Sequence, residues 1–170
     1  MRKFVLAVAA AATLFGATGG ALAETTVDYS KADAAMNAAV AEARSYLPQV
    51  LAAFDQANES GRGAFSLKAG LPMTDGADGT EHIWVSNIHH EGDKFSATLA
   101  NVPDHLKGLK EGSPVTFTRD QISDWYIETP AGLYGAFSIR VMLKDLPPEV
   151  AAEQKRMLTA DPVPASWKKK

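Results

Sequence analysis

Apolar residues recur at alternating intervals of four and three between residues 30 and 63, which predicts a long amphipathic helix. Ser30 is the expected N-cap, with Asp33 three residues later as in a capping box, and the glycine turn at residues 61–63 ends the helix. Pro48 interrupts it, because proline lacks a backbone N–H. Since the stripe continues across Pro48, a kink is favoured over two abutting helices. The stripe consists of Met36, Val40, Ala43, Leu47, Val50 and Phe54.

In the middle of the chain, apolar and polar residues alternate with a period near 2, which predicts strands. Gly92 is expected at the positive-φ position of a hairpin turn, and residues 69–80, rich in Gly, Pro, Asp and Thr, in a loop. Pro148 suits the first turn of a last helix that ends near Thr159. The predicted strands cover residues 65–67, 83–85, 95–99, 115–118, 125–127 and 136–143.

The order of helix, strands and helix indicates an α+β fold. We expect an N-terminal, Pro-kinked helix packed on a curved antiparallel sheet of about five or six strands, with a short C-terminal helix. The apolar helix stripe is expected to dock on this sheet, because an amphipathic helix is stabilised mainly by burying its apolar face.

The first 23 residues have the pattern of a secretory signal peptide. Two basic residues precede an apolar run at residues 4–15, and residues 21–23 read Ala-Leu-Ala, a small-x-small cleavage site. A membrane anchor is the alternative, but a span needs about 20 apolar residues and this run is shorter. We therefore expect cleavage after Ala23, a periplasmic or secreted protein without membrane insertion, and one domain at residues 24–170.

Composition narrows the partners of this domain. Loss of Arg2 and Lys3 with the leader leaves 15 basic and 20 acidic residues, so the net charge changes from −3 to −5. This argues against a nucleic-acid partner, because phosphates attract clustered Lys and Arg. The chain has no cysteine, which excludes disulfides and a thiol nucleophile. Gly132 and Gly135 lack the spacing of a phosphate-binding loop, and no cofactor is expected.

Two short blocks stand out, Glu-His-Ile-Trp-Val at residues 81–85 and Ile-Ser-Asp-Trp at residues 122–125. Together with further matching positions, they make the chain resemble a family of uncharacterised bacterial domains, the YegJ-like proteins (domain of unknown function 2314), over a core of about residues 31–145. Ala136 departs from the pattern, where a second glycine is expected after Gly135. The resemblance implies an exported α+β domain and no assigned reaction. The further positions are Arg44, Lys68, Asn101, Pro103, Gly112, Gly132, Tyr134, Gly135 and Arg140.

Glu81 and His82 are a possible acid–base pair, because a carboxylate can orient an imidazole and raise its basicity. However, adjacent side chains on a strand point to opposite faces, which favours a structural role for His82. His89 and His90 also diverge on extended backbone, and His105 lies far along the chain. A zinc site needs about four converging ligands, so we expect no metal.

The remaining candidates form a hypothetical cluster on the sheet, either a ligand groove with aromatic walls or a structural clamp. In the clamp, which we favour, Arg140 pairs with Glu81 or Asp124, because buried charges are usually paired. We expect a non-catalytic module that binds a protein, peptide or small ligand of the cell envelope. The alternative is a small hydrolase or isomerase that uses Glu81, His82 or Asp124. The candidate binding residues are Glu81, His82, Trp84, Asp124, Trp125 and Arg140.

Overall fold

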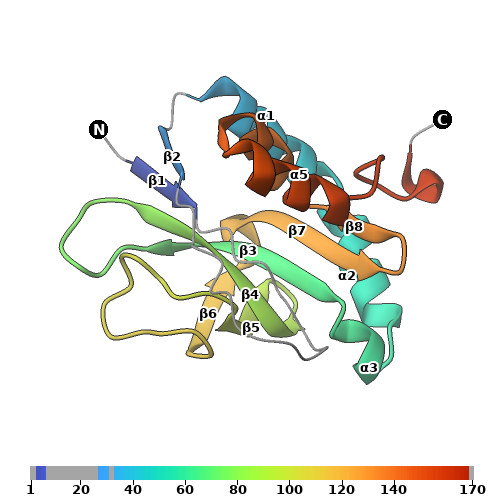
Figure 1. Cartoon of the computed structure of the whole chain (residues 1–170). Coiled ribbons are helices and arrows are strands. Elements are labelled where there is room, and N and C mark those ends of the chain that lie inside the picture. Colours follow the sequence, from blue (N-terminus) through green and yellow to red (C-terminus); the bar gives the residue numbers. More distant parts are fainter. Residues whose placement is uncertain (1–2, 7–26, 31–32, 169–170) are drawn as a thin grey trace, which may run out of the picture.

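The computed structural model describes residues 3–6, 27–30 and 33–168. A curled sheet with strand order β6-β5-β4-β3-β7-β8 forms its centre, and each neighbouring pair is antiparallel (Figure 1). The sheet stays open, with β6 and β8 at its ends. An antiparallel sheet flanked by helices confirms the predicted α+β fold. Its strands are β3 (Phe65–Pro72), β4 (Thr80–Glu91), β5 (Lys94–Leu99), β6 (Pro114–Thr118), β7 (Ile122–Thr129) and β8 (Gly132–Gly135).

Two short strands from the start of the chain extend this sheet. β1 (Lys3–Leu6) pairs with β2 (Val27–Ser30) and meets β4 in parallel, with Leu6 opposite His82. Most of the predicted signal peptide, residues 1–2 and 7–23 with the cleavage site, lies outside the described residues. In the part of the chain that the structure describes, no helix is long and apolar enough to cross a membrane.

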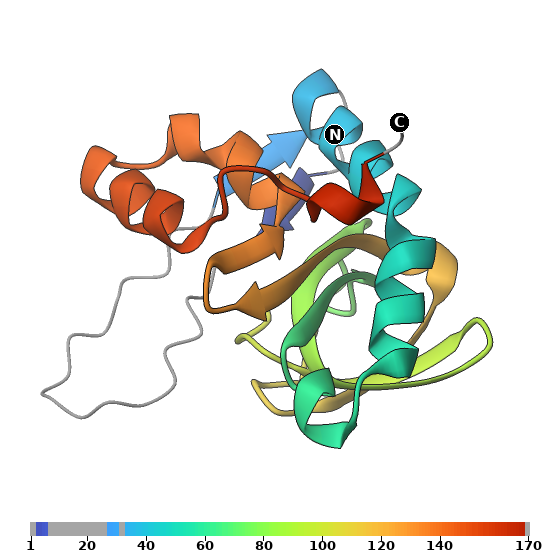
Figure 2. The ribbon, with the colours of Figure 1, turned by 90° about the vertical axis from the view of Figure 1, so that its right-hand side faces the viewer.

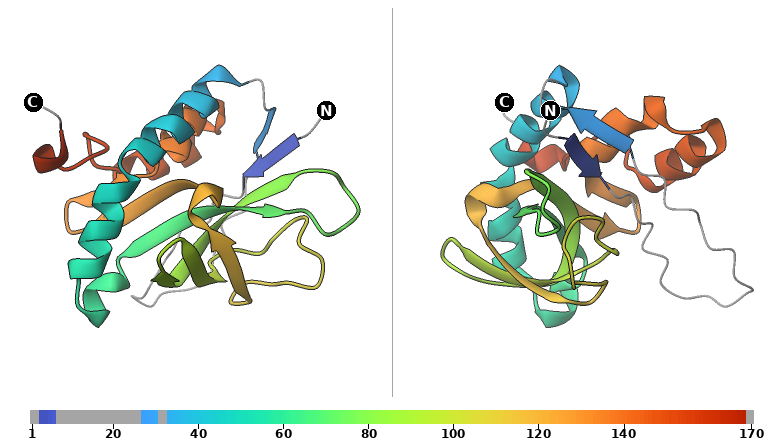
Figure 3. Two further views of the ribbon diagram at one scale, coloured as in Figure 1. Left: turned by 180° about the vertical axis from the view of Figure 1, so that it is seen from behind. Right: turned by 90° about the vertical axis from the view of Figure 1, so that its left-hand side faces the viewer.

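Helices cover the sheet on two sides of its curl (Figures 2 and 3). α1 packs against β7 and α4, and α5 lies against β8. Short 3-10 turns follow β6 and α4, at Arg119–Gln121 and Leu143–Asp145, and a third lies near the C-terminus at Ala165–Trp167. The helices are α1 (Ala34–Ser45), α2 (Leu47–Gln56), α3 (Glu59–Arg62), α4 (Phe137–Met142) and α5 (Pro148–Met157).

The helix breaks near the predicted position, but the favoured kink at Pro48 is wrong, because two abutting helices, α1 and α2, meet at Tyr46. Pro48 lies in the first turn of α2, where a missing N–H costs no helical hydrogen bond. The N-cap of α1 is Asp33, whose carboxylate accepts the Met36 N–H at 2.7 Å, whereas Ser30 ends β2. The apolar stripe is buried except at Val40, which is half-buried.

Five of the predicted strands are confirmed, and the hairpin glycine Gly92 has φ +60°. β3 continues to Pro72, so the predicted loop is shorter than residues 69–80. The prediction of a strand at residues 136–143 is wrong, because this segment forms α4 and the turn after it. Ala136 turns the chain with a left-handed φ of +53°, and the carboxylate of Asp124 then accepts the first N–H groups of α4.

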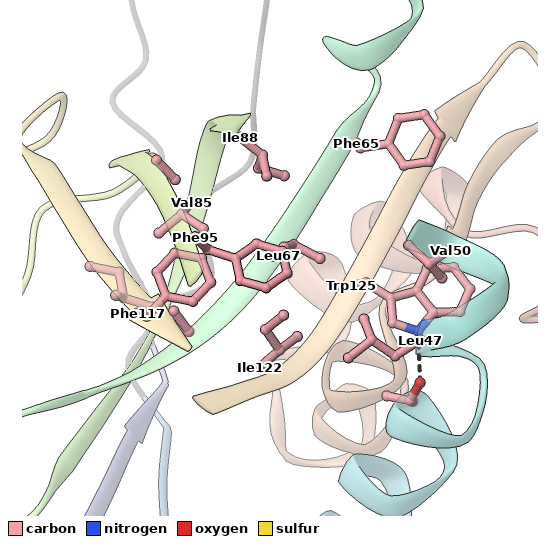
Figure 4. Close-up of a cluster of buried hydrophobic side chains, with 14 of the residues drawn as sticks. Leu47, Val50, Phe65, Leu67, Val85, Ile88, Phe95, Phe117, Ile122 and Trp125 are labelled. Atoms are coloured by element: carbon pink, nitrogen blue, oxygen red, sulfur yellow. Dashed lines mark hydrogen bonds between the residues drawn. The ribbon is translucent and has the colours of Figure 1, made fainter. Parts of the chain in front are cut away.

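The two faces of the sheet differ in chemistry. The face inside the curl is apolar and packs against α1 and α2 through residues such as Leu67, Val85 and Trp125 (Figure 4). The indole N–H of Trp125 donates to the Ala43 carbonyl at 2.9 Å, which fixes α1 against β7. The other face carries polar and aromatic side chains, and Ala136 and Ile139 pack against it. The candidate site lies on this second face.

Candidate functional site

Lys68 and Asp124 lie opposite each other on β3 and β7, and each is 1% exposed. A hydroxyl group connects the two charges: the Lys68 amine donates to Ser138 Oγ at 3.0 Å, and Ser138 Oγ donates to Asp124 Oδ2 at 2.7 Å. Removing a pair of charges from water costs free energy, which is recovered only if further hydrogen bonds satisfy the remaining donors and acceptors. The surroundings of the carboxylate supply these bonds.

Asp124 caps the N-terminus of α4. Its Oδ1 accepts the N–H groups of Trp125 at 2.8 Å and Phe137 at 3.2 Å, and its Oδ2 accepts the Ser138 N–H at 2.8 Å in addition to the Ser138 hydroxyl. Burial raises the pKa of Asp124, while the charge of Lys68 and these donors oppose the increase. With four donors on two oxygens, the carboxylate has no acceptor position left for another group.

Burial lowers the pKa of the Lys68 amine from 10.5 to about 8, and the charge of Asp124 limits the decrease. The amine also lies over the Trp84 ring, 4.6 Å from its centroid, and Trp84 packs against Tyr126 at 4.9 Å. From the sequence alone, Lys68 is a position that matches the family pattern and not a candidate site residue. The sequence pattern that could have identified it is a lysine between two apolar residues, Leu67 and Ala69, at the end of the predicted strand at residues 65–67.

A pocket of about 400 Å³ lies between α1 and this face of the sheet. His82 Nδ1 lies 2.8 Å from Ser123 Oγ in its wall. A β-bulge allows this contact, because Lys68 pairs with Asp124 and Ala69 with Ile122, so that Ser123 is the extra residue. The lining is Met36, Asn37, Val40, Arg44, Lys68, Gly70, Pro72, Thr80, His82, Asp120, Gln121, Ser123 and Ser138.

Arg44 borders the pocket from α1. Its Nε donates to the Ile122 carbonyl at 2.8 Å and its Nη2 to the Asp120 carbonyl at 2.6 Å. These bonds tie the helix to the start of β7, next to the bulge. Arg44 therefore holds the wall of the pocket in place and leaves part of its guanidinium at the rim.

The predicted single cluster is wrong, because its members lie on both faces of the sheet. Glu81 pairs across the strands with Leu71, on the apolar face, while His82 pairs with Gly70 on the Lys68 face. The buried carboxylate of Glu81 accepts the N–H groups of Asp104 at 2.8 Å and His105 at 2.9 Å. Glu81 thus anchors the loop before β6 and does not orient the neighbouring imidazole. Trp125 also faces the apolar core.

The predicted pairing of Arg140 with Glu81 or Asp124 is wrong as well. The Arg140 guanidinium donates to the carbonyls of Gly135 and Thr159 at 2.9 Å and of Leu133 at 3.3 Å. Among the described residues, no carboxylate forms a salt bridge with it. Arg140 is a clamp for the main chain that connects α4, β8 and the segment after α5.

The histidines are used separately. His90 Nε2 lies 2.9 Å from Asp55 Oδ1, and His105 Nδ1 lies 2.6 Å from Asp75 Oδ2. His89 is exposed. Within the described ranges, no three His, Asp or Glu side chains are grouped so that they could hold a metal ion.

A larger hollow of about 850 Å³ lies between α2 and the β5–β6 hairpin. Its floor contains His90 and Phe95, which stack on each other, and Phe117, which stacks on Phe95. Phe95 and Phe117 belong to the hydrophobic core. The hollow contains none of the six candidate residues, whereas the smaller pocket contains His82 and borders the Lys68–Asp124 network.

Comparisons with known proteins agree with the motifs. A family model described as "Uncharacterized protein conserved in bacteria (DUF2314)" matches residues 33–160. The chain is 26% identical to uncharacterized protein YegJ of Escherichia coli (strain K12) over 160 residues, which are 93% of this chain and 99% of that protein.

A second relative comes from Neisseria meningitidis serogroup B, and its name describes an ankyrin repeat protein. It is 33% identical over 81 residues, which are 46% of this chain and 32% of that protein. No solved structure matches the chain. Because the family model covers most of its length, the chain belongs to the DUF2314 family of bacterial proteins.

Proposed function

We propose that this protein is an exported, non-catalytic binding module, and that its ligand site is the pocket between α1 and the Lys68 face of the sheet. The ligand is a small molecule of the cell envelope or the end of a peptide. Export is supported by the leader pattern at residues 1–23. A pocket that combines apolar walls with a few fixed polar groups is the usual form of a small-ligand site.

The observation that carries this proposal is the use of both buried carboxylates for structure. A general acid or base must reach a proton on the substrate, with an oxygen or nitrogen available for it. Glu81 accepts two main-chain N–H groups on the far face of the sheet, and Asp124 accepts four donors within its own network. Neither carboxylate has the freedom that the alternative, a small hydrolase or isomerase, requires.

The serines of the pocket are also held in ways that oppose nucleophilic catalysis. A serine nucleophile gives its proton to an adjacent base. Ser138 donates its proton to Asp124 and accepts a hydrogen bond from the Lys68 amine, so in this network the amine is a donor to the hydroxyl and not its base. Ser123 Oγ donates to the Lys68 carbonyl at 3.2 Å and lies 2.8 Å from His82 Nδ1. While its hydroxyl donates to this carbonyl, Ser123 keeps its proton and is not activated by His82.

The test is a thermal-shift screen of the exported protein against small envelope components. Val40 is half-buried in the pocket wall, so Val40→Trp fills the pocket, whereas Ala38→Trp adds the same ring to the exposed side of α1. A ligand of the pocket raises the Tm of the wild type and of Ala38→Trp, but not of Val40→Trp. Ligands that stabilise all three proteins equally would place the site elsewhere.

Export has its own test. Mass spectrometry of the natively expressed protein should find Glu24 at the N-terminus, as expected for cleavage after Ala23. Full-length protein that starts at Met1 in the cytoplasm would contradict the exported role.

A further inference from the structure

We infer that the ligand presents a carboxylate to Lys68 and an apolar body to α1, so that the pocket is a site for small amphipathic carboxylates. This inference rests on the proposed function, because it names the ligand class of the same pocket. The Lys68 amine donates to Ser138 Oγ, and among the described residues its other N–H donors have no hydrogen-bond acceptor.

An ammonium group has three N–H donors and no acceptor. One donor of Lys68 is used by Ser138 Oγ, and the Trp84 ring receives the positive charge from one side. Among the described residues, the amine has no second hydrogen-bond acceptor, since all four acceptor positions of Asp124 are taken by other donors. A buried donor without a partner is costly, and Lys68 belongs to the pocket lining. An acceptor that enters the pocket removes this cost.

The charges around the pocket favour an anion as that acceptor. Lys68 and Arg44 are cations in its lining, and His82 adds an imidazole, against the single carboxylate of Asp120. Asp124 contributes its charge behind Lys68 but does not line the pocket, and other donors take its acceptor positions. An anionic oxygen therefore gains a charge-assisted hydrogen bond from Lys68, which is about twice as strong as a neutral one.

The opposite wall favours an apolar body. Met36 and Val40 from α1, together with Pro72 at the end of β3, face the same space. Methionine adapts its shape to irregular ligands because its side chain is unbranched and flexible. A carboxylate at the Lys68 end and an aliphatic or aromatic portion between these residues satisfies both halves of the pocket. A free fatty acid and the carboxyl end of a short apolar peptide share this chemistry.

The experiment compares hexanoate with 1-hexanol, which has the same chain without the charge, by titration of the exported protein labelled at its methionine methyl groups. Hexanoate should shift the Met36 methyl signal and bind at least about tenfold more tightly than 1-hexanol, a preference of about 1.4 kcal/mol. The same titration compares an apolar peptide that has a free carboxyl terminus with the same peptide amidated at that end. The affinities of this peptide and of hexanoate then show whether the pocket prefers a peptide or a fatty acid.

Lys68→Met should remove the preference for hexanoate, whereas Lys110→Met, at an exposed loop lysine, should keep it. The comparison of two ligands on the wild type needs no variant, so it stands even if Lys68→Met folds poorly. Equal binding of hexanoate and 1-hexanol would overturn the carboxylate inference and leave the pocket proposal intact. Absence of any Met36 shift with hexanoate would also overturn it, while the Val40→Trp screen decides separately whether the pocket binds other ligands.

Discussion

Above pH 8 the folded protein should become more stable, because the buried Lys68 amine loses its proton there before the unfolded chain does. The pKa of Lys68 is about 8 in the fold and 10.5 ordinarily. Between these values the unfolded state binds more protons, so the free energy of unfolding rises with pH. Since each tenfold change in an equilibrium constant is about 1.4 kcal/mol, the full increase is about 3 kcal/mol.

The assay is urea denaturation at a series of pH values from 7 to 10.5, followed by tryptophan fluorescence, for the wild type and Lys68→Met. The other lysines and the tyrosines are common to both proteins, so the difference between the two curves isolates Lys68. The free energy of unfolding of the wild type should rise relative to Lys68→Met by about 3 kcal/mol as the amine becomes neutral. Parallel pH curves would show that Lys68 is not buried as a cation.

Other predictions concern single contacts. Phe54→Ala should lower the free energy of unfolding by about 3–5 kcal/mol, because Phe54 is buried. Gln56→Ala, on the exposed side of α2, should change it by less than about 0.5 kcal/mol. Equal effects of the two substitutions in urea denaturation would mean that the buried face of α2 is misassigned. Ala136→Gly should change it by less than about 1 kcal/mol, because relief of the left-handed backbone offsets the loss of a buried methyl group; a larger loss in the same assay would show that φ at Ala136 costs little. NMR titration should find the pKa of His105 above 6.5, because Asp75 accepts its hydrogen bond, and a lower pKa in Asp75→Asn. The contribution of this pair to stability is present below pH 6.5 and is lost as the pH rises through the raised pKa. An unchanged pKa of His105 in Asp75→Asn would contradict this prediction. Dialysis against a chelator should leave the melting curve unchanged, and a loss of stability that Zn²⁺ restores would reveal a structural metal.

Hydrophobic spacing predicted most of the fold, because α1, α2 and the β4–β5 hairpin depend on local sequence. It failed at α4, which has only six residues. Phe137, Ile139 and Val141 alternate as in a strand, but the helix depends on a cap from Asp124, which is more than ten residues earlier in the chain. A helix this short has little intrinsic stability, so tertiary contacts decide its form.

The site was harder to predict, because its contacts join distant strands. The clamp hypothesis paired Arg140 with Glu81 or Asp124, but Asp124 is connected through Ser138 to Lys68 and not to Arg140. The register between β3 and β7 places Lys68 opposite Asp124, and the bulge turns Ser123 toward His82. Residue types alone specify neither the register nor the bulge, since both arise from how whole strands pack.

The central claim, that the pocket above Lys68 binds a ligand, is tested most directly by native mass spectrometry of the protein released gently from the periplasm. The wild type and Ala38→Trp should carry a bound small molecule in addition to the polypeptide mass, and dissociation should release an acidic compound. Val40→Trp, which fills the pocket, should show the polypeptide mass alone. The same bound mass in Val40→Trp, or the bare polypeptide mass in all three proteins, would contradict the claim.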